Sequence, residues 1–320
     1  MVCVTALDAV AVYLPPTLVP VEDLADRLEL TDIQVKLFRR FHELREIRLA
    51  GPESAADLLM GAAAALAELR DNADRVRYVV YGRAMPVTEP YPVNRIDEVR
   101  RALGLEHALA FTVTQQSCAG GLLAIALAGR LLADDAAAEP PPGPGREPLA
   151  LVLTGEKTFT RHAQLIPGTS VFGEASAACL VSADGPRNRL LAYACAQRGE
   201  FDVVGGGSPS KFQREYLPAL AAVIRQAVDQ AGIGLDDLRL ILPHNVNVVT
   251  WQRLCILLRY PLDRVVLDNV AAGGHLFCSD AFVNYRTAMR RGLLAPGDRY
   301  LVATVGSGEG ATFAAMIFEH

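Results

Sequence analysis

Residues 112–132 read TVTQQSCAGGLLAIALAGRLL, and the architecture of the chain is inferred most directly from them. An apolar run reaches a single cysteine, Cys118, which is followed by three small residues, Ala119–Gly121, and by an alanine- and leucine-rich segment. The pattern predicts a strand at Ala108–Val113 and a helix from Cys118 to Leu132, with the thiol at the turn between them. The small residues leave room for a second segment of backbone to approach the helix.

The position of this thiol has a chemical consequence. A helix N-terminus presents free N–H groups and positive partial charge, which favour a thiolate over a thiol. The same N–H groups can hold an oxyanion when the thiolate attacks a thioester carbonyl. Cys118 is therefore the candidate nucleophile. A buried cysteine is more often a small packing residue, and we assign that role to Cys3, Cys179, Cys195 and Cys255.

Strand and helix patterns alternate along the chain, and their order repeats in its second part. We therefore predict an α/β fold of two similar halves, residues 1–185 and 186–320, with helices covering a sheet. The Pro- and Gly-rich segment 136–148 is predicted to be a surface loop. The other predicted strands are Val2–Val12, Arg77–Gly82, Leu149–Leu153, Ala175–Ser182, Leu190–Cys195, Leu238–Leu242, Val265–Leu267, Tyr300–Thr304 and Thr312–Phe318. The other predicted helices are Ser54–Arg70, Asn94–Leu103, Arg214–Ala231, His275–Arg291 and one that starts near Trp251.

Composition argues against several classes of protein. The chain has 320 residues, is 51% hydrophobic and carries a formal charge of −5, so it can bury a large core and gives no reason to expect nucleic acid or an anionic membrane as a partner. Its cysteines lack metal-ligand spacing, so we expect no metal and a cytoplasmic location. The start lacks the basic region of a signal peptide. Residues 122–133, LLAIALAGRLLA, stop too soon for a membrane span and include Arg130.

Further chemically active residues stand at the ends of predicted strands. His244 lies in ILPHNVN, His275 lies in AAGGHLFCSD at the start of a predicted helix, and the glycine turn GSGEG occupies residues 306–310. Ligands of α/β sheets bind at the carboxyl ends of strands. Imidazoles can donate a hydrogen bond to a thioester oxygen and move protons near neutral pH. Together with Cys118 these segments predict an active site, whereas a surface or packing role is assigned to His42, His107 and His162.

This ordered set of motifs resembles ketoacyl synthase III, and in particular its acyltransferase relatives in secondary metabolism. The resemblance covers nearly the whole chain and rests on VYLPP, QQSCAGGLLA, VFGEASAACLV, LPHNVN, NVAAGGHLFCSDAF and GSGEGATFAAMIF. It implies the thiolase fold, in which two βαβαβαββ-type halves form a five-layered α-β-α-β-α core. It also implies a homodimer.

Residue roles follow from the same resemblance. Cys118 looks like the nucleophile that accepts the acyl group. His244 and Asn247 match the histidine and asparagine of the family's HxxN motif. The backbone N–H groups of Cys118 and Ser307 match its oxyanion hole, and the turn there is expected to be kept open by Gly306 and Gly308.

Two residues depart from the pattern of ketoacyl synthase III. His275 stands where that enzyme has asparagine, so the set of one cysteine and two histidines resembles the elongating, decarboxylating synthases. Asp280 stands where the family usually has a small residue, and some acyltransferase relatives use a Cys-His-Asp set. Asp280 is expected to orient His275 or His244 as a base, or to cap its helix. If it faces the pocket, it would also repel the carboxylate of a malonyl group.

The region that binds the acyl donor differs as well. Leu37, Phe41 and Val249 occupy the positions of the tryptophan and arginines that clamp coenzyme A in the housekeeping enzyme. A weakened coenzyme A site favours a donor on an acyl carrier protein, which needs only a tunnel for its phosphopantetheine arm. Carrier proteins are acidic, and the predicted docking arginines are Arg39, Arg40, Arg45 and Arg253.

The sequence therefore predicts an acyltransferase of natural-product biosynthesis that works by ping-pong transfer through Cys118. His244, with His275 and Asp280, is expected to activate the acceptor, which is a hydroxyl, an amine or a second carrier thiol. No cofactor is expected, since acyl-phosphopantetheine or acyl-coenzyme A is the substrate. The alternative is a decarboxylating ketoacyl synthase that condenses with malonyl carrier protein. A silent partner subunit is disfavoured, because Cys118 is intact.

Overall fold

The computed structural model describes residues 5–138, 146–202, 209–308 and 310–320. Cys3 and residues 139–145 of the predicted loop lie outside the described residues. One nine-stranded sheet has the order β11-β12-β13-β10-β1-β9-β6-β4-β5. Its strands are β1 Ala6–Tyr13, β4 Val76–Gly82, β5 Leu109–Val113, β6 Leu149–Glu156, β9 Ala175–Ser182, β10 Arg189–Arg198, β11 Leu238–Pro243, β12 Arg299–Gly308 and β13 Gly310–Glu319.

The strand order is the same in the two halves of this sheet when each is read from the middle. The first half runs β1, β9, β6, β4, β5 and the second runs β10, β13, β12, β11; they meet at one residue pair, Ala6 and Arg189. In the second half the place of β5 is taken by Val265, which forms a single bridge with Ile241. The prediction of a strand at Val265–Leu267 is therefore wrong. The proposed boundary between residues 185 and 186 falls between β9 and β10 and stays a prediction.

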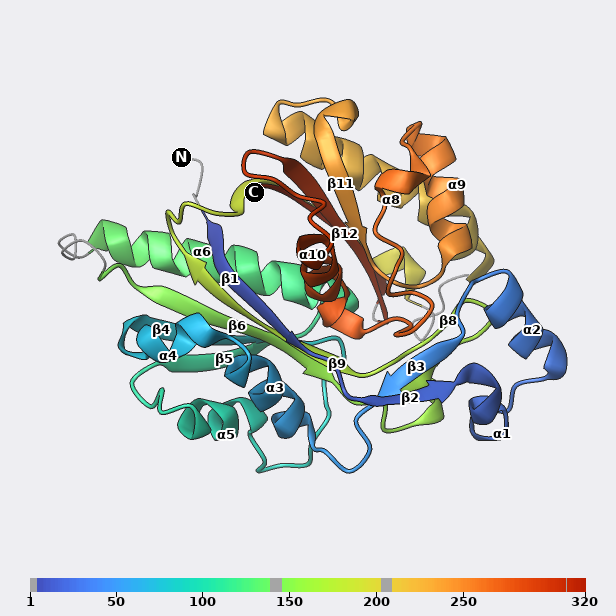
Figure 1. The fold of residues 1–320 in the computed structure, drawn as a ribbon, viewed down its shortest axis with the longest axis horizontal. Helices are drawn as coiled ribbons and strands as arrows, with labels where there is room; N and C mark the ends of the chain where they lie inside the picture. Colours follow the sequence, from blue (N-terminus) through green and yellow to red (C-terminus); the bar gives the residue numbers. More distant parts are fainter. Residues whose placement is uncertain (1–4, 139–145, 203–208, 309) are drawn as a thin grey trace.

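Helices form three layers around the two halves of the sheet (Figure 1). Helices α6 (Gly120–Ala138) and α10 (Asp280–Arg290) lie between the halves, in an apolar cluster that draws residues from both. A second cluster packs α3 (Ala55–Ala64) and α5 (Arg95–Ala102) on the outer face of the first half, and a third packs the long α8 and α9 on the outer face of the second. The five-layered α-β-α-β-α arrangement is confirmed. The bounds of the last two helices are Pro209–Ala231 for α8 and Val248–Leu258 for α9.

Several predicted helices begin or end elsewhere. The pattern at Ser54–Arg70 forms two helices, α3 and α4 (Ala67–Asp71), and Ser54 caps the first through a reciprocal pair of hydrogen bonds with Asp57. The helix predicted from His275 starts only at Asp280, after the 3-10 turn η7 (Phe277–Ser279). His275 instead lies on an extended segment that bridges to Phe172.

Residues 17–49 form a small lobe beyond the ends of β1 and β9 and near α9, and the sequence patterns gave no elements for it (Figure 1). Its elements are the hairpin β2 (Thr17–Pro20) and β3 (Glu46–Leu49) and the helices α1 (Ala25–Leu28) and α2 (Asp32–Arg40). Leu28, Phe38 and Ile47 are fully buried in its own apolar cluster. The remaining elements are α7 Arg161–Gln164, β7 Leu165–Ile166, β8 Ser170–Val171, η1 Val21–Leu24, η2 Ala73–Arg75, η4 Gly199–Phe201, η5 Leu235–Asp237 and η6 Leu262–Arg264.

The helical segment Ser117–Ala138 is 22 residues long and apolar enough to cross a membrane by length and composition. The prediction that this stretch stops too soon for a span is wrong, because the helix continues past Leu132 to Ala138. In the folded chain, however, α6 is a core helix between the two halves of the sheet (Figure 1). A buried core helix passes the same test, so this is weak evidence for a membrane segment.

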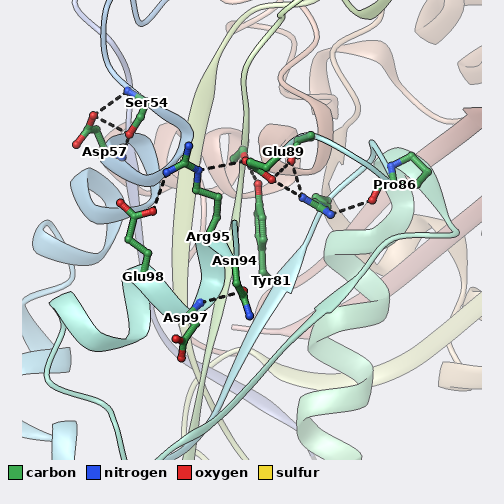
Figure 2. A network of polar contacts seen from close by, with 12 residues as sticks. Ser54, Asp57, Tyr81, Pro86, Glu89, Asn94, Arg95, Asp97 and Glu98 are labelled. Atoms are coloured by element: carbon green, nitrogen blue, oxygen red, sulfur yellow. Dashed lines mark hydrogen bonds and ion pairs between the residues drawn. The ribbon is translucent and has the colours of Figure 1, made fainter. Parts of the chain in front are cut away.

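A network of charges fixes the loop that follows β4 (Figure 2). Glu89 bridges Arg83 and Arg95, at 3.4 Å from a guanidinium nitrogen of each. Arg83 also donates to the Pro86 carbonyl oxygen at 2.9 Å. The buried Glu156 carboxylate accepts the backbone N–H groups of the two residues after Arg83, at 2.7 and 2.8 Å. These contacts hold one wall of the cavity described next.

Candidate active site

A cavity of about 1160 Å³ opens where the ends of β5 and β12 meet the loops before α9 and α10. Cys118, Tyr216 and His275 line it, and so do the aromatic rings of Phe172 and Phe277. These two phenyl rings stack with centroids 4.2 Å apart, and Phe172 also packs on the His275 ring at 4.6 Å. The volume is sufficient for a small-molecule ligand.

Cys118 sits in a 3-10 turn, η3 (Ser117–Ala119), one turn before α6 begins. Ser117 has a φ of 50°, a left-handed conformation that is uncommon for a residue with a Cβ, so the turn is held under strain. The predicted approach of a second backbone is confirmed: a Cβ on Gly121 would lie 3.0 Å from the Cys278 carbonyl oxygen. The small residues after the thiol let η7 pack against the start of α6.

The glycine turn supports the cysteine turn from the opposite side. A Cβ on Gly306 would lie 2.0 Å from the Gln116 carbonyl oxygen, so only glycine fits there. The Ser307 carbonyl oxygen accepts the Ser117 hydroxyl at 3.0 Å. An added Cβ on Gly308 meets nothing within 4 Å among the described residues, so the expectation that it keeps the turn open stays a prediction. The use of the Cys118 and Ser307 N–H groups as an oxyanion hole stays a prediction.

Gly306→Ala is expected to destabilise the protein by about 1–3 kcal/mol, because the new methyl group overlaps the turn that carries Cys118. Acylation of Cys118 should slow together with this loss. Denaturant unfolding and the rate of acyl loading measure the two effects. Gly308→Ala is the matched control, since an added Cβ there meets open space. Equal effects of the two substitutions would show that the contact with Gln116 is unimportant.

His275 and Asp280 form a buried pair beside Cys118. The His275 Nδ1 lies 2.5 Å from one carboxylate oxygen of Asp280, and both side chains are at most 3% exposed. The same carboxylate accepts the backbone N–H groups of Asn245 at 2.6 Å and Leu276 at 2.7 Å. Of the three roles that the sequence left open, Asp280 orients His275 rather than His244. It also binds backbone N–H groups on both sides of the site.

The environment of His275 favours its protonated form. Burial alone would lower the pKa of His275, but the negative charge of Asp280, followed by that of Cys118, raises it to about 10. A hydrogen bond with the Cys118 side chain acts in the same direction. With Nδ1 on the carboxylate, the other ring nitrogen, Nε2, is the one that faces the sulfur. The arrangement can hold a proton beside Cys118 and release it to a neighbouring atom.

Asp280 itself lies behind His275, outside the set of described residues that line the cavity. It is 2% exposed, and its oxygens accept three hydrogen bonds from the protein. Asp280 does not face this cavity, so the condition under which it was expected to repel a malonyl carboxylate is not met. Its effect on the reaction passes through the His275 ring.

His244 lies deeper than His275 and is fully buried. Its Nε2 is 2.5 Å from the hydroxyl of Tyr216, a residue of α8 that the sequence patterns did not single out. Burial first, and then the positive charge of His275, lower the pKa of His244 to about 3, so the ring is neutral. Tyr216 lines the cavity, and His244 lies behind it, outside the described lining. The primary activating role predicted for His244 is therefore not favoured by this geometry.

Asn247 is engaged in holding the backbone. Its side-chain oxygen accepts the Thr250 N–H at 2.7 Å and so caps α9, and its amide nitrogen donates to the Thr169 carbonyl oxygen at 3.1 Å. The first contact fixes the start of α9, and the second joins the loop after His244 to the segment that carries Thr169, which also lines the cavity. Asn247 also lines the cavity, which is compatible with the supporting role expected from the sequence.

One of the four predicted docking arginines reaches the cavity. Arg253 is exposed and lines the rim, one helical turn after Val249 on the same face of α9. Arg39 is paired with Glu22 at 2.8 Å. The others, Arg40 and Arg45, are exposed but lie outside the described lining, as do Leu37 and Phe41.

Two histidines that were assigned surface or packing roles line the same cavity, namely His42 and His162. Burial first, then the positive charge of nearby Arg253, lower the pKa of His42. The sequence gave no sign that either histidine is near the active site, because neither follows a predicted strand. His42 belongs to the lobe, and His162 belongs to α7. Within the described ranges, no group of three or more His, Cys, Asp or Glu side chains is arranged to hold a metal ion.

Known proteins share this architecture. Residues 228–320 match the family model described as 3-oxoacyl-[acyl-carrier-protein (ACP)] synthase III C terminal. The beta-ketoacyl-[acyl-carrier-protein] synthase III of Erythrobacter litoralis is 27% identical over 319 residues, which cover 92% of this chain and 93% of the relative. The solved acyltransferase ChlB3 has a TM-score of 0.81 at 21% identity and covers 98% of this chain and 97% of its own. The 3-oxoacyl-[acyl-carrier-protein] synthase III of Aquifex aeolicus has a TM-score of 0.79 at 19% identity, with 99% and 100% covered.

Proposed function

Since the chain is a ketoacyl-synthase-III-like enzyme with the thiolase fold, we propose that it is an acyltransferase of natural-product biosynthesis. It takes an acyl group from a carrier-protein thioester onto Cys118 and transfers it to an acceptor hydroxyl, amine or second carrier thiol. The hydrogen bond of 2.5 Å between His275 Nδ1 and Asp280 carries this proposal. It makes His275 a base toward an acceptor, in a Cys-His-Asp set.

The first half-reaction loads the enzyme. The Cys118 sulfur bonds to the acyl carbon of the thioester, and the bond from that carbon to the pantetheine sulfur breaks. Protonated His275 gives its Nε2 proton to the departing sulfur, which leaves as a neutral thiol. An acyl-enzyme and a neutral His275 remain.

The second half-reaction moves the group to the acceptor. Asp280 keeps the remaining ring proton on Nδ1, so Nε2 of the neutral ring presents a lone pair to the cavity. That lone pair takes the proton of the acceptor while the acceptor atom bonds to the acyl carbon. The bond to Cys118 then breaks, and the sulfur and protonated His275 are restored.

A decarboxylating ketoacyl synthase is the second candidate. It is favoured by the two histidines, whose ring centroids are 6.1 Å apart, and by the names of the sequence relatives. In that reaction imidazole N–H groups polarise the oxygen of a malonyl thioester. After loading, however, His275 presents a lone pair rather than an N–H group, because Asp280 holds its proton on the other nitrogen. This geometry favours transfer to a heteroatom.

The two candidates are separated by supplying acylated enzyme with labelled malonyl carrier protein and with a hydroxyl or amine acceptor. We expect acyl transfer to the acceptor without release of carbon dioxide. Carbon dioxide and a ketoacyl product that depend on Cys118 and His275 would assign the condensing reaction instead. Intact-mass analysis of the enzyme in the same mixture reports whether the acyl group was on the protein.

We also propose that the donor is bound to an acyl carrier protein and that Arg253 receives the acidic carrier or its phosphate. At low salt, Arg253→Ser should reduce the rate of loading from the carrier thioester by about tenfold, and added salt should diminish the difference. Arg40→Ser is the matched control, because Arg40 is exposed but lies outside the described lining. Loading that is faster from acyl-coenzyme A than from the carrier would contradict the proposal.

The remaining expectations stay proposals. We propose that the enzyme needs no metal or cofactor, that it is cytoplasmic and that it is a homodimer. The dimer is supported by β5, which stands at the end of the sheet with Leu109 62% exposed. A strand edge with an exposed apolar side chain offers a pairing surface to a second copy.

A further inference from the structure

The contact between Tyr216 and His244 is not needed for the two half-reactions described above. Tyr216 comes from α8, and its hydroxyl meets the His244 Nε2 at 2.5 Å in the wall that faces Cys118 and His275. We propose that Tyr216 binds the acceptor: its phenol oxygen accepts a hydrogen bond from the O–H or N–H group that will attack the acyl-enzyme. This inference rests on the proposed function and narrows the acceptor to an alcohol or an amine.

The direction of the hydrogen bond follows from the surroundings of His244. The ring is neutral and therefore carries one proton. The Ala303 carbonyl acts on the His244 ring as a hydrogen-bond acceptor and raises its pKa. Because Tyr216 already occupies Nε2, we assign this contact to Nδ1, which has no other hydrogen-bond partner among the described residues. A lone pair directed at that oxygen would be repelled, so the proton belongs on Nδ1 and Nε2 carries the lone pair. Tyr216 must then donate its own proton to His244.

The phenol of Tyr216 keeps that proton. Burial first, and then the negative charge of Cys118, raise the pKa of Tyr216, so it stays a neutral phenol. With its proton committed to His244, its oxygen has only acceptor capacity left for a group in the cavity. The best-matched partner is a strong donor, the O–H of an alcohol or the N–H of an amine. A thiol is a weak donor, and the enolate of a condensing reaction has no proton to give.

His244 acts through Tyr216 and is a positioning residue in this scheme. The Trp251 indole donates to the His244 carbonyl oxygen at 2.9 Å, and the His244 backbone N–H donates to Ala303 at 3.0 Å. These bonds fix the backbone of His244, and therefore the place at which the phenol is held. In water or an amine, His275 removes a second proton that Tyr216 does not bind. In an alcohol it removes the single O–H proton as the attack begins, and the hydrogen bond to Tyr216 breaks.

The test compares oxygen and sulfur nucleophiles in the same protein. The acyl-Cys118 enzyme is isolated, and two rates are measured. The first is the rate of hydrolysis by water, the smallest hydroxyl acceptor, and the second is the rate of acyl transfer back to the thiol of pantetheine. Tyr216→Phe should lower the ratio of the two rates by about 10–100-fold, because only the O–H nucleophile uses the phenol oxygen. Tyr260→Phe is the matched control, since it removes a buried tyrosine hydroxyl that donates to the Leu238 carbonyl oxygen. A ratio that changes less than twofold in Tyr216→Phe would overturn the proposal.

A second comparison tests whether the two residues act together. His244→Gln should lower the same ratio, and Tyr216→Phe combined with His244→Gln should lower it no further than the more severe single substitution. Additive losses would refute the shared role. The outcomes that would refute the proposed function are distinct from these. In that case Cys118 would not be acylated, or carbon dioxide would be released from malonyl carrier protein.

A measurement on the unaltered enzyme covers the case in which Tyr216→Phe does not fold. Nitrogen NMR of ¹⁵N-histidine-labelled protein reports which ring nitrogen of His244 is protonated, with the signal assigned by its loss in His244→Gln. We expect a proton on Nδ1 and a hydrogen-bonded lone pair on Nε2. A proton on Nε2 would reverse the hydrogen bond to Tyr216 and refute the inference.

Discussion

Cys118→Ala is expected to abolish covalent acylation of the protein. Incubation with an acyl carrier protein thioester should add one acyl mass to the wild type and none to the variant. Transfer to the acceptor should fall by at least about 10³-fold, because both half-reactions pass through this sulfur. The residue is 6% exposed and lines the cavity at the strained turn before α6, so its replacement by a smaller side chain leaves the backbone in place.

Cys255→Ala is the control for this experiment. Cys255 is a buried cysteine of α9 that packs in the outer cluster of the second half, and its burial raises the pKa of its thiol to about 11. The variant should still gain one acyl mass. Peptide mapping that places the acyl group on Cys255 or Cys278 would remove Cys118 as the nucleophile, even if the total mass were correct.

The turn at Cys118 could be predicted because its signals are local. An apolar run, one thiol, small residues and a helical pattern follow one another within 21 residues of sequence, 112–132. The segment that approaches the small residues could not be identified in the same way. It is η7, whose Cys278 lies 161 residues after Ser117, and only the fold brings the Cys278 carbonyl oxygen to Gly121.

The distinct roles of the two histidines could not be read from the sequence. Asp280 follows His275 by five residues, a spacing at which side chains in a helix do not face each other. The pair forms because His275 is outside the helix: Gly274 takes a φ of 66°, His275 bridges to Phe172, and η7 turns the chain back. The prediction of a helix from His275 missed this arrangement and left the partner of Asp280 open.

Tyr216 was missed for a related reason. In sequence it belongs to an ordinary amphipathic helix, 28 residues before His244, and nothing local marks its hydroxyl. The one available signal was the spacing of two aromatic residues, Phe212 and Tyr216, which pack edge to face with centroids 5.4 Å apart. Such a pair is typical of core packing, so it favours no function by itself.

Asp280→Asn is expected to slow acyl transfer by about 10²–10⁴-fold while the protein remains folded. The asparagine side chain would present either its N–H or its neutral oxygen to His275 Nδ1. Without the negative charge of the carboxylate, the ring proton would no longer be fixed on Nδ1. In the other tautomer Nε2 carries the proton and cannot accept one from the acceptor. The measurement is the decay of preformed acyl-enzyme in the presence of acceptor, with Asp268→Asn, which removes an exposed ion pair with Arg291, as the matched control.

The pH dependence of stability gives this prediction a readout that a general loss of packing would not reproduce. The folded-state pKa of His275 is raised from 6.5 to about 10, so the protonated ring stabilises the folded protein fully below pH 6.5. This contribution is lost as the pH rises from 6.5 through about 10, because the unfolded chain gives up the proton first. Asp280→Asn removes the larger of the two charges that hold the proton, and the fall in unfolding free energy across this window should become much smaller. A variant that keeps this fall, or that transfers its acyl group at the wild-type rate, would show that His275 functions without Asp280.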